Sequence, residues 1–96
     1  MRIQQSFCYP LFQPDGMGLG DLFARAAGIG YKAVELWFRD DGLGGIVRAA
    51  HDNGLVVASM CGHNAIERGL NNRADHDRIE RELRESIDVA VAHGIP

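Results

Sequence analysis

Residues 28–38 read GIGYKAVELWF, a glycine-flanked helix end that runs directly into an apolar strand. Residues 53–61, which read NGLVVASMC, repeat this signal, and residues 93–96, which read HGIP, begin it again. Glycine commonly ends a helix, and a short apolar run after it is typical of a buried strand. The pattern therefore predicts three βα units and then the entrance to a fourth strand, as expected for a fragment of a larger α/β protein.

The predicted helices follow from the spacing of their apolar residues. Residues 19–28 place apolar side chains at i, i+3, i+4 and i+7, and Gly28 is the predicted stop. Residues 42–53 form a weaker helix, because Gly44 and Gly45 each cost about 1 kcal/mol relative to alanine. On residues 75–93, the face from 78 to 88 that mixes arginine and acidic residues is predicted to be solvated. The opposite, buried stripe is Ile79, Leu83, Ile87, Ala90 and Val91.

The predicted strands are residues 3–9, 33–38 and 55–61, and with the three helices they form one α/β domain over residues 1–96. Near-continuous apolar strands favour a parallel βαβαβα sheet buried on both faces, with right-handed crossovers. Residues 16–20, GMGLG, lie too far from the first strand for a phosphate-binding turn, so nucleotide binding is disfavoured. A closed barrel and an open doubly wound sheet both begin in this way.

Composition narrows the classes of function. The 96 residues are 46% hydrophobic with a formal net charge of −3, which is the balance of a chain that packs a core. Charges of both signs are spread along the chain, so neither a nucleic acid nor a membrane is expected as a partner. No leader or membrane-spanning run is evident, and the expected location is cytoplasmic. In that reducing compartment, Cys8 and Cys61 are predicted to be buried free thiols.

Candidate site residues stand where the predicted strands end, which is where α/β folds place their ligands. Glu35 is a carboxylate in an apolar strand, and it either serves a site or pairs with an arginine or a backbone amide. Trp37 can stack on a carbon skeleton or act only in packing. His63 follows Gly62 at a strand exit and either serves the site or hydrogen-bonds the loop. No pair among the four histidines has metal-ligand spacing, so no metal site is predicted.

Five stretches together resemble the N-terminal part of the hydroxypyruvate isomerase-like proteins, which belong to the xylose-isomerase-like TIM-barrel superfamily of sugar isomerases and epimerases. The resemblance covers essentially all of this chain and the first three of the family's eight βα units. It implies the N-terminal part of a (β/α)8 TIM barrel. The stretches are QSFCYP at 5–10, AVELW at 33–37, ASMCGH at 58–63, GLNNR at 69–73 and DHDRIE at 75–80.

The resemblance also implies an activity and a substrate class. Such enzymes interconvert aldehyde and ketone forms of a small hydroxy-carbonyl acid or sugar by proton transfer, often with Mg²⁺ or Mn²⁺ bound in the complete barrel. The family's catalytic glutamates lie beyond Pro96, so no catalytic residue and no cofactor is assigned to this chain, which is expected to be inactive alone. Carried over by position, Glu35, Trp37 and His63 would shape the substrate pocket, and Arg73 would anchor an anion.

Two other classes remain open. The chain is alternatively an independent small-molecule-binding α/β module that dimerises through its sheet edge, since a three-stranded sheet leaves two edges for self-association. The superfamily also contains a DNA-repair endonuclease branch, which relies on a histidine-rich metal cluster and a basic groove. The balanced charge and the isolated His63 argue against that branch.

Overall fold

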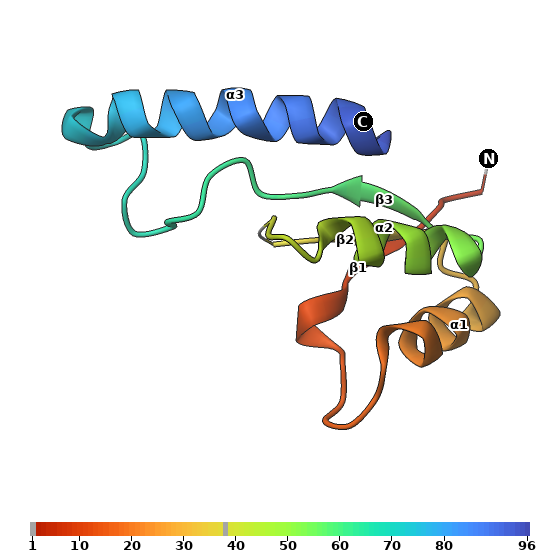
Figure 1. The fold of residues 1–96 in the computed structure, drawn as a ribbon. Helices are drawn as coiled ribbons and strands as arrows, with labels where there is room; N and C mark the ends of the chain where they lie inside the picture. The colour runs from red at the N-terminus through yellow and green to blue at the C-terminus, as the bar shows by residue number, and fades with distance from the viewer. Residues whose placement is uncertain (1, 38) are drawn as a thin grey trace.

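The computed structural model describes residues 2–37 and 39–96, and it contains three βα units in series (Figure 1). The predicted α/β class is confirmed. The elements are β1 (Ser6–Cys8), η1 (Tyr9–Leu11), α1 (Leu19–Ile29), β2 (Ala33–Glu35), α2 (Leu43–Asp52), β3 (Val56–Ser59), η2 (Arg73–Asp75) and α3 (His76–His93), where η1 and η2 are short 3₁₀ turns.

The three strands form one parallel sheet, as predicted, and their order in it is β1-β2-β3. Phe7 lies opposite Val34, and Val34 lies opposite Val57, so one apolar row crosses the sheet. These three side chains are buried and belong to the core that α1 and α2 close. Phe23 of α1, which is completely buried, meets the ring of Phe7 edge-on at 6.4 Å between centroids. The helices are therefore held by an aromatic and aliphatic contact layer over this row.

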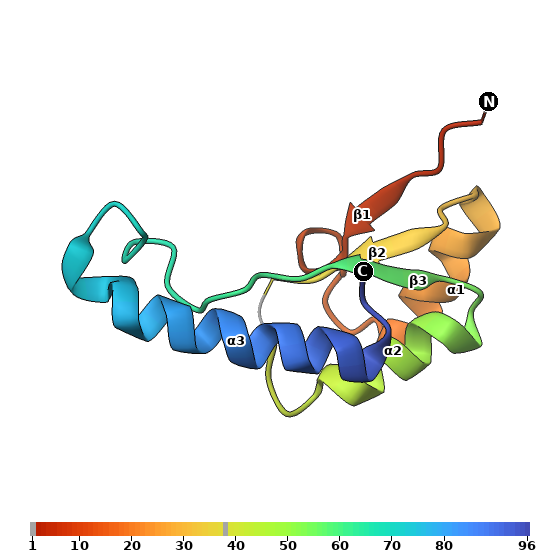
Figure 2. The same cartoon turned by 90° about the horizontal axis from the view of Figure 1, so that it is seen from above.

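The three helices lie on the same side of the sheet (Figure 2). Right-handed crossovers that always step to the next strand place every helix on one face. On the other face Val56 is 55% exposed, and Ser6 and Ser59 are also exposed. The expectation of a sheet buried on both faces is therefore wrong for the part of the chain that the structure describes.

The first helix ends at Ile29, one residue later than predicted, and its capping glycine lies two residues later than predicted. Gly28 lies inside α1, and Gly30 is the capping residue, with φ of 121° and its N–H directed to the carbonyls of Ala26 and Ala27. Only glycine adopts such a φ without strain. Gly28 and Gly30 flank Ile29, and either glycine can end a helix. The apolar spacing stops at Ala27 and therefore favoured Gly28, whereas the structure uses Gly30.

The strands are shorter than predicted. Residues 3–5 precede β1, Ile3 is 86% exposed, and Tyr9 already belongs to the 3₁₀ turn. Beyond β2 the backbone pairing continues irregularly, since the N–H of Cys61 donates to the carbonyl of Trp37 at 2.7 Å. Phe38, the last residue of the predicted second strand, lies outside the described residues.

The apolar stripe of α3 is only partly buried. Ile79 is fully buried, whereas Ile87 is 62% exposed and Val91 is 76% exposed, so the prediction of a continuous buried stripe is wrong. The end of α3 that runs past the sheet is its N-terminal end, where Ile79 is buried (Figure 1). The exposure of Ile87 and Val91 therefore follows from α3 being the last helix of the row, with no further described helix on its outer side. The face predicted to be solvated also contains a buried residue, Ser86. Among the described residues, no helix has the length and apolar character needed to cross a bilayer.

Candidate functional site

A hollow of about 560 Å³ opens where the chain leaves β2 and β3. It brings together two of the four substrate-binding residues predicted from the sequence, one from each strand exit. The side of the hollow opposite β2 comes from the long loop between β3 and α3. Its lining residues are Trp37, Cys61, Gly62, His63, Ile66 and Gly69.

Trp37 reaches the hollow because side chains alternate along a strand. Val34 and Leu36 turn into the core, where they are 0% and 4% exposed, and Glu35 and Trp37 take the other side. Trp37 is 44% exposed, and its carbonyl is fixed by the N–H of Cys61. An indole ring held in this way offers an apolar surface on which a ligand can stack.

His63 is half-buried in the same hollow. Its Nδ1 atom is buried and has no hydrogen-bond partner among the described residues. Glu82 of α3 accepts a hydrogen bond from the N–H of Asn64, the residue after His63, at 3.2 Å. This bond and then the guanidinium of Arg78 lower the pKa of the Glu82 carboxyl, with a smaller contribution from His63. His63 therefore combines a place in the hollow with a polar atom that the loop leaves unbonded.

Glu35 lies on the uncovered face of the sheet and does not line the hollow. The hydroxyl of Ser59 donates a hydrogen bond to its carboxylate at 3.3 Å, so its partner is a serine of the neighbouring strand. Cys8 lies on the same face, and its pKa is raised, first by burial and then by the charges of Glu35 and Cys61. Cys8 and Cys61 are free thiols as predicted, but both are half-buried rather than buried.

Arg73 is not brought to the hollow. It is exposed at the start of η2 and is not among the residues that line the cavity. Asp75, two residues later, is instead the centre of a polar cluster. This carboxylate is 1% exposed, pairs with Arg68 at 2.6 Å and accepts a hydrogen bond from Asn72 at 3.1 Å. Sequence reasoning had treated Asp75 only as the start of a helix.

The cluster anchors the long loop to the first turn of α3. Arg78 donates to the carbonyl of Arg68 at 2.7 Å, and Nε2 of His76 lies 2.7 Å from the carbonyl of Leu70. The loop that carries His63 and Ile66 is therefore tied down at both its middle and its end. In the sequence, the signal that could have predicted this cluster is Asp75 directly before a helix, with Arg78 three residues later.

The resemblance implies Mg²⁺ or Mn²⁺, so the donor set was compared with what such ions require. Hard divalent cations take several oxygen ligands at one point. Within residues 2–37 and 39–96, no group of three or more histidine, cysteine, aspartate or glutamate side chains converges to hold a metal ion. The described residues therefore do not by themselves provide the ligands that such an ion requires.

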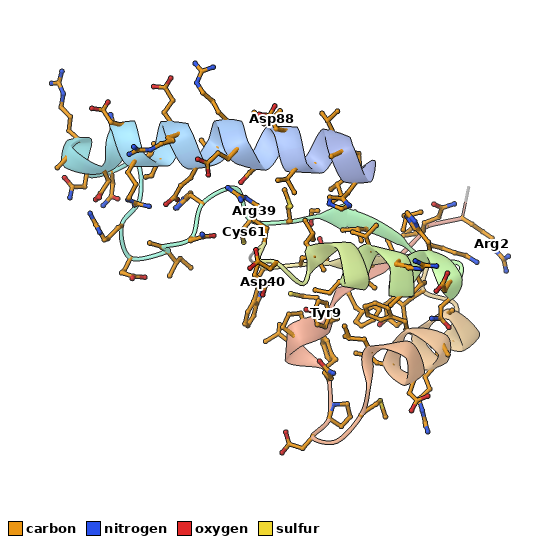
Figure 3. All side chains as sticks on the ribbon, in the orientation of Figure 1. Arg2, Tyr9, Arg39, Asp40, Cys61 and Asp88 are labelled. Carbon is orange, nitrogen blue, oxygen red and sulfur yellow. The ribbon has the colours of Figure 1, made fainter. Side chains whose placement is uncertain are left out.

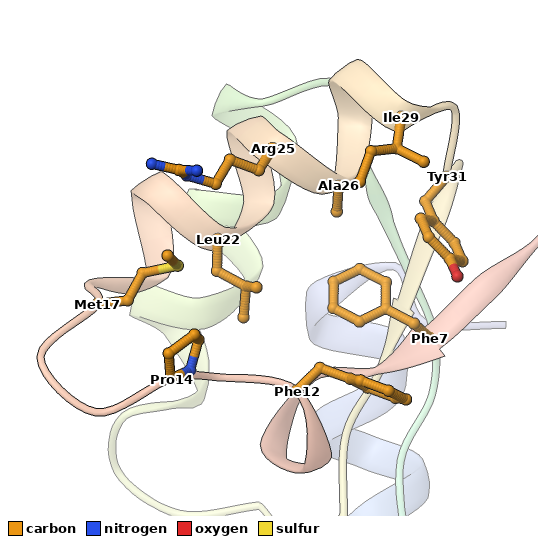
Figure 4. A pocket seen from close by; sticks show the side chains of 9 residues that line it. All are labelled: Phe7, Phe12, Pro14, Met17, Leu22, Arg25, Ala26, Ile29 and Tyr31. Carbon is orange, nitrogen blue, oxygen red and sulfur yellow. The ribbon is translucent and has the colours of Figure 1, made fainter.

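A second hollow, of about 300 Å³, lies between α1, the loop before it and the edge of β1 (Figure 4). Its walls are almost entirely apolar, with Phe7, Phe12 and Leu22 around the space. Arg25 borders it, but the guanidinium extends away from the aromatic rings (Figure 4). A space without converging polar groups offers nothing to orient a reacting ligand. The hollow at Trp37 and His63 is therefore the candidate site.

Comparison of the chain with family models, with curated proteins and with solved structures finds no match. Assignment of a function consequently depends on the geometry of the hollow and on the resemblance of the sequence.

Proposed function

We propose that the hollow at Trp37 and His63 binds a small hydroxy-carbonyl acid or sugar, and that the chain is the N-terminal part of a hydroxypyruvate isomerase-like (β/α)8 barrel. The observation that carries the proposal is that Trp37 and His63, from the exits of β2 and β3, line one cavity. In parallel α/β architectures this end of the sheet is where substrates bind.

The arrangement of the strands also supports a barrel. Strand order follows chain order and the helices cover a single face, as in successive units of a barrel wall. The uncovered face then corresponds to the barrel interior, with Glu35 and Ser59 pointing toward it. Further βα units would cover Val56, which is 55% exposed here.

Each residue has a role suited to its chemistry. Trp37 provides a flat apolar surface for the carbon skeleton of the ligand, and His63 provides a nitrogen that can bond a hydroxyl or carbonyl oxygen. Glu35 lies outside the hollow on the uncovered face, and its carboxylate would accept a hydrogen bond from a substrate hydroxyl that reaches that face of the sheet. Isomerisation needs an acid and a base held within hydrogen-bond reach of adjacent carbons. The described residues that line the hollow include one imidazole and no carboxylate, so the remaining groups must come from outside this lining.

The binding step can be tested with the chain's own fluorescence. Trp37 is the single tryptophan, so emission reports directly on the hollow. Titration with hydroxypyruvate or D-xylose is expected to change the emission in a saturable manner. His63→Ala should abolish the saturation, and His51→Ala, on an exposed position of α2, should leave it intact. A linear response in all three proteins would rule out the binding proposal.

The activity of the chain alone is a separate test. We expect no turnover of hydroxypyruvate by the 96-residue chain, with or without Mg²⁺ or Mn²⁺, because the acid/base pair is incomplete. Turnover above the buffer rate that Glu35→Gln or His63→Ala removes would instead make these residues the catalytic pair.

The second candidate function is a binding module that dimerises through a sheet edge, and the edge of β3 favours it. A groove of about 190 Å³ runs beside this strand, between Met60 and the exposed Ile87 of α3. A second copy could occupy it. Sedimentation over a range of concentrations separates the candidates, since a discrete dimer supports the module, and Ile87→Glu should then dissociate it.

A further inference from the structure

Ser86 joins the two strand exits that form the hollow. Its side chain is 4% exposed, although it lies on a helical face rich in charged residues. The Nε of Arg39 donates to the hydroxyl oxygen at 2.8 Å, and the hydroxyl donates to the carbonyl of Gly62 at 2.7 Å. Arg39 is further held by an ion pair with Glu85 at 3.0 Å. One hydroxyl thus uses both its acceptor and its donor capacity on different segments.

The two partners of Ser86 flank the two walls of the hollow. Arg39 follows Trp37 by two residues at the exit of β2, and Gly62 directly precedes His63 at the exit of β3. Figure 3 shows Arg39 and Cys61 in this region, between α3 and the strand ends. The backbone bond from Cys61 to Trp37 joins the exits on the sheet side, and Ser86 joins them on the helix side.

An apolar side chain in place of Ser86 could not make the two hydrogen bonds of its buried hydroxyl. Removing the hydroxyl, as in Ser86→Ala, would leave the Arg39 Nε and the Gly62 carbonyl without this partner at a position where Ser86 is 4% exposed. The exits would keep the backbone bonds from Leu36 to Ser59 and from Cys61 to Trp37 on the sheet side, and would lose the hydroxyl that bonds both exits directly on the helix side. A ligand held between them would then meet a cavity of variable width, and positional errors of about 1 Å are costly for binding and chemistry.

We infer that Ser86 is a positioning residue that sets the spacing between Trp37 and His63, acting through Arg39 and Gly62. The inference rests on the proposed function only where ligand affinity is concerned. The spacing itself is a property of the chain without ligand, and it can be measured independently.

The spacing can be read from the emission of Trp37 as a function of pH. A protonated imidazole quenches indole fluorescence only at close range, so the pH-dependent part of the emission reports the distance between the rings of Trp37 and His63. Glu82 faces His63 from α3, and its carboxylate keeps its charge through the neutral range because its pKa is lowered by the Asn64 N–H and by Arg78. Cys61 is the other titratable group at the hollow.

The wild-type chain should lose emission as the pH falls, and His63→Ala should remove that loss. Ser86→Ala should reduce the loss by about half or more, and Ser86→Thr, which retains the hydroxyl, should restore it. Arg39→Gln removes the guanidinium that donates to Ser86 and leaves the bond from Ser86 to Gly62 in place. Its loss of emission should lie between that of Ser86→Ala and that of the wild-type chain. Ser59→Ala, whose hydroxyl bonds Glu35 instead, is the matched control and should behave as wild type.

Titration with hydroxypyruvate completes the test. Ser86→Ala should weaken the affinity about tenfold, and Ser86→Thr should remain within about twofold of wild type. If hydroxypyruvate does not bind the wild-type chain, the proposed function fails and the pH-dependent emission alone decides the role of Ser86. If Ser86→Ala and Arg39→Gln, folded by circular dichroism, quench as wild type does, the positioning role is overturned.

Discussion

Gly62 lies against Leu83 so closely that a β-carbon on Gly62 would stand 2.5 Å from Cδ2 of the leucine. Real contacts of this kind do not occur, so any larger residue must displace the leucine side chain of α3. Gly62 also supplies the carbonyl that Ser86 bonds and directly precedes His63. A side chain at this position would therefore force Leu83 to rearrange where the strand exit passes beneath the helix.

Gly62→Ala should destabilise the fold by about 1–2 kcal/mol, because Leu83 must leave its position to admit the methyl group. Urea unfolding measures the change. Gly45→Ala is the matched control, since nothing lies within 4 Å of the added carbon in α2, and it should stabilise by about 0.5–1 kcal/mol. Equal effects of the two substitutions would contradict the close approach to Leu83.

A second pair of glycines tests where α1 ends. Gly30→Ala should cost about 1–2 kcal/mol, because φ of 121° is strained for any residue with a β-carbon. Gly28→Ala should instead gain up to about 1 kcal/mol, because Gly28 is helical and has open space around it. The melting temperatures of both variants measure these changes. If Gly28→Ala were the destabilising variant and Gly30→Ala the stabilising one, the helix would end at Gly28.

The carboxylate of Asp75 should contribute substantially to stability. Asp75→Asn is expected to destabilise by about 2 kcal/mol, because it leaves Arg68 and Arg78 without the buried charge between them. Glu80→Gln removes a comparable ion pair with Arg84 from an exposed site and should change stability by less than about 0.5 kcal/mol. Chemical unfolding at neutral pH compares the two, and similar losses would show that the buried cluster adds nothing.

The two isoleucines of the α3 stripe, Ile79 and Ile87, should contribute very differently to the free energy of unfolding. Ile79→Ala should cost about 3 kcal/mol, since the side chain is completely buried, and Ile87→Ala should cost less than about 0.5 kcal/mol at 62% exposure. Urea midpoints of dilute samples provide the comparison. A large loss at Ile87 that grows with protein concentration would reveal that another copy covers this face.

Cys8 should react slowly with alkylating reagents near neutral pH. Burial, then Glu35 and Cys61, raise the pKa of its thiol, so the reactive thiolate forms at higher pH in the folded chain than in the unfolded one. In a Cys61→Ser background, Glu35 and burial still act, and the midpoint of the alkylation rate should lie above that of the same protein in urea. Because the folded pKa is the raised one, the associated stability declines as the pH rises from the unfolded value toward the folded value. Coincident midpoints would argue against a buried thiol beside Glu35.

The sequence allowed the sheet and its helices to be predicted because their signals are local. The spacing of Leu22, Phe23 and Ala26 identifies a covering helix without knowledge of its partners, and the same side chains are buried in the structure. The strands were predicted to be longer than they are, because the apolar runs of the sequence continue past the residues that form the β-ladder. The helix end at Gly30 differed from prediction for a similar reason, since two glycines met the same local rule.

The remaining features depend on contacts that no local pattern encodes. Ser86 reads as a solvated helical residue until Arg39, 47 positions away, and Gly62 are placed beside it. Ile66 and Gly69 belong to a loop without periodicity, so their place in the hollow follows only from the way Asp75 ties that loop to α3. Trp37 and His63 were identified because strand exits are a general location for sites, which is a rule of topology and not of residue type.

The strand order has a consequence for synthesis. Because β1, β2 and β3 are adjacent in the order in which they are made, each new strand leaving the ribosome finds its partner already present at the growing edge. No later segment has to be inserted between two earlier ones, and the chain segments that must close are only one βα unit long. The molecule can thus assemble vectorially, one strand and one helix at a time, in step with translation.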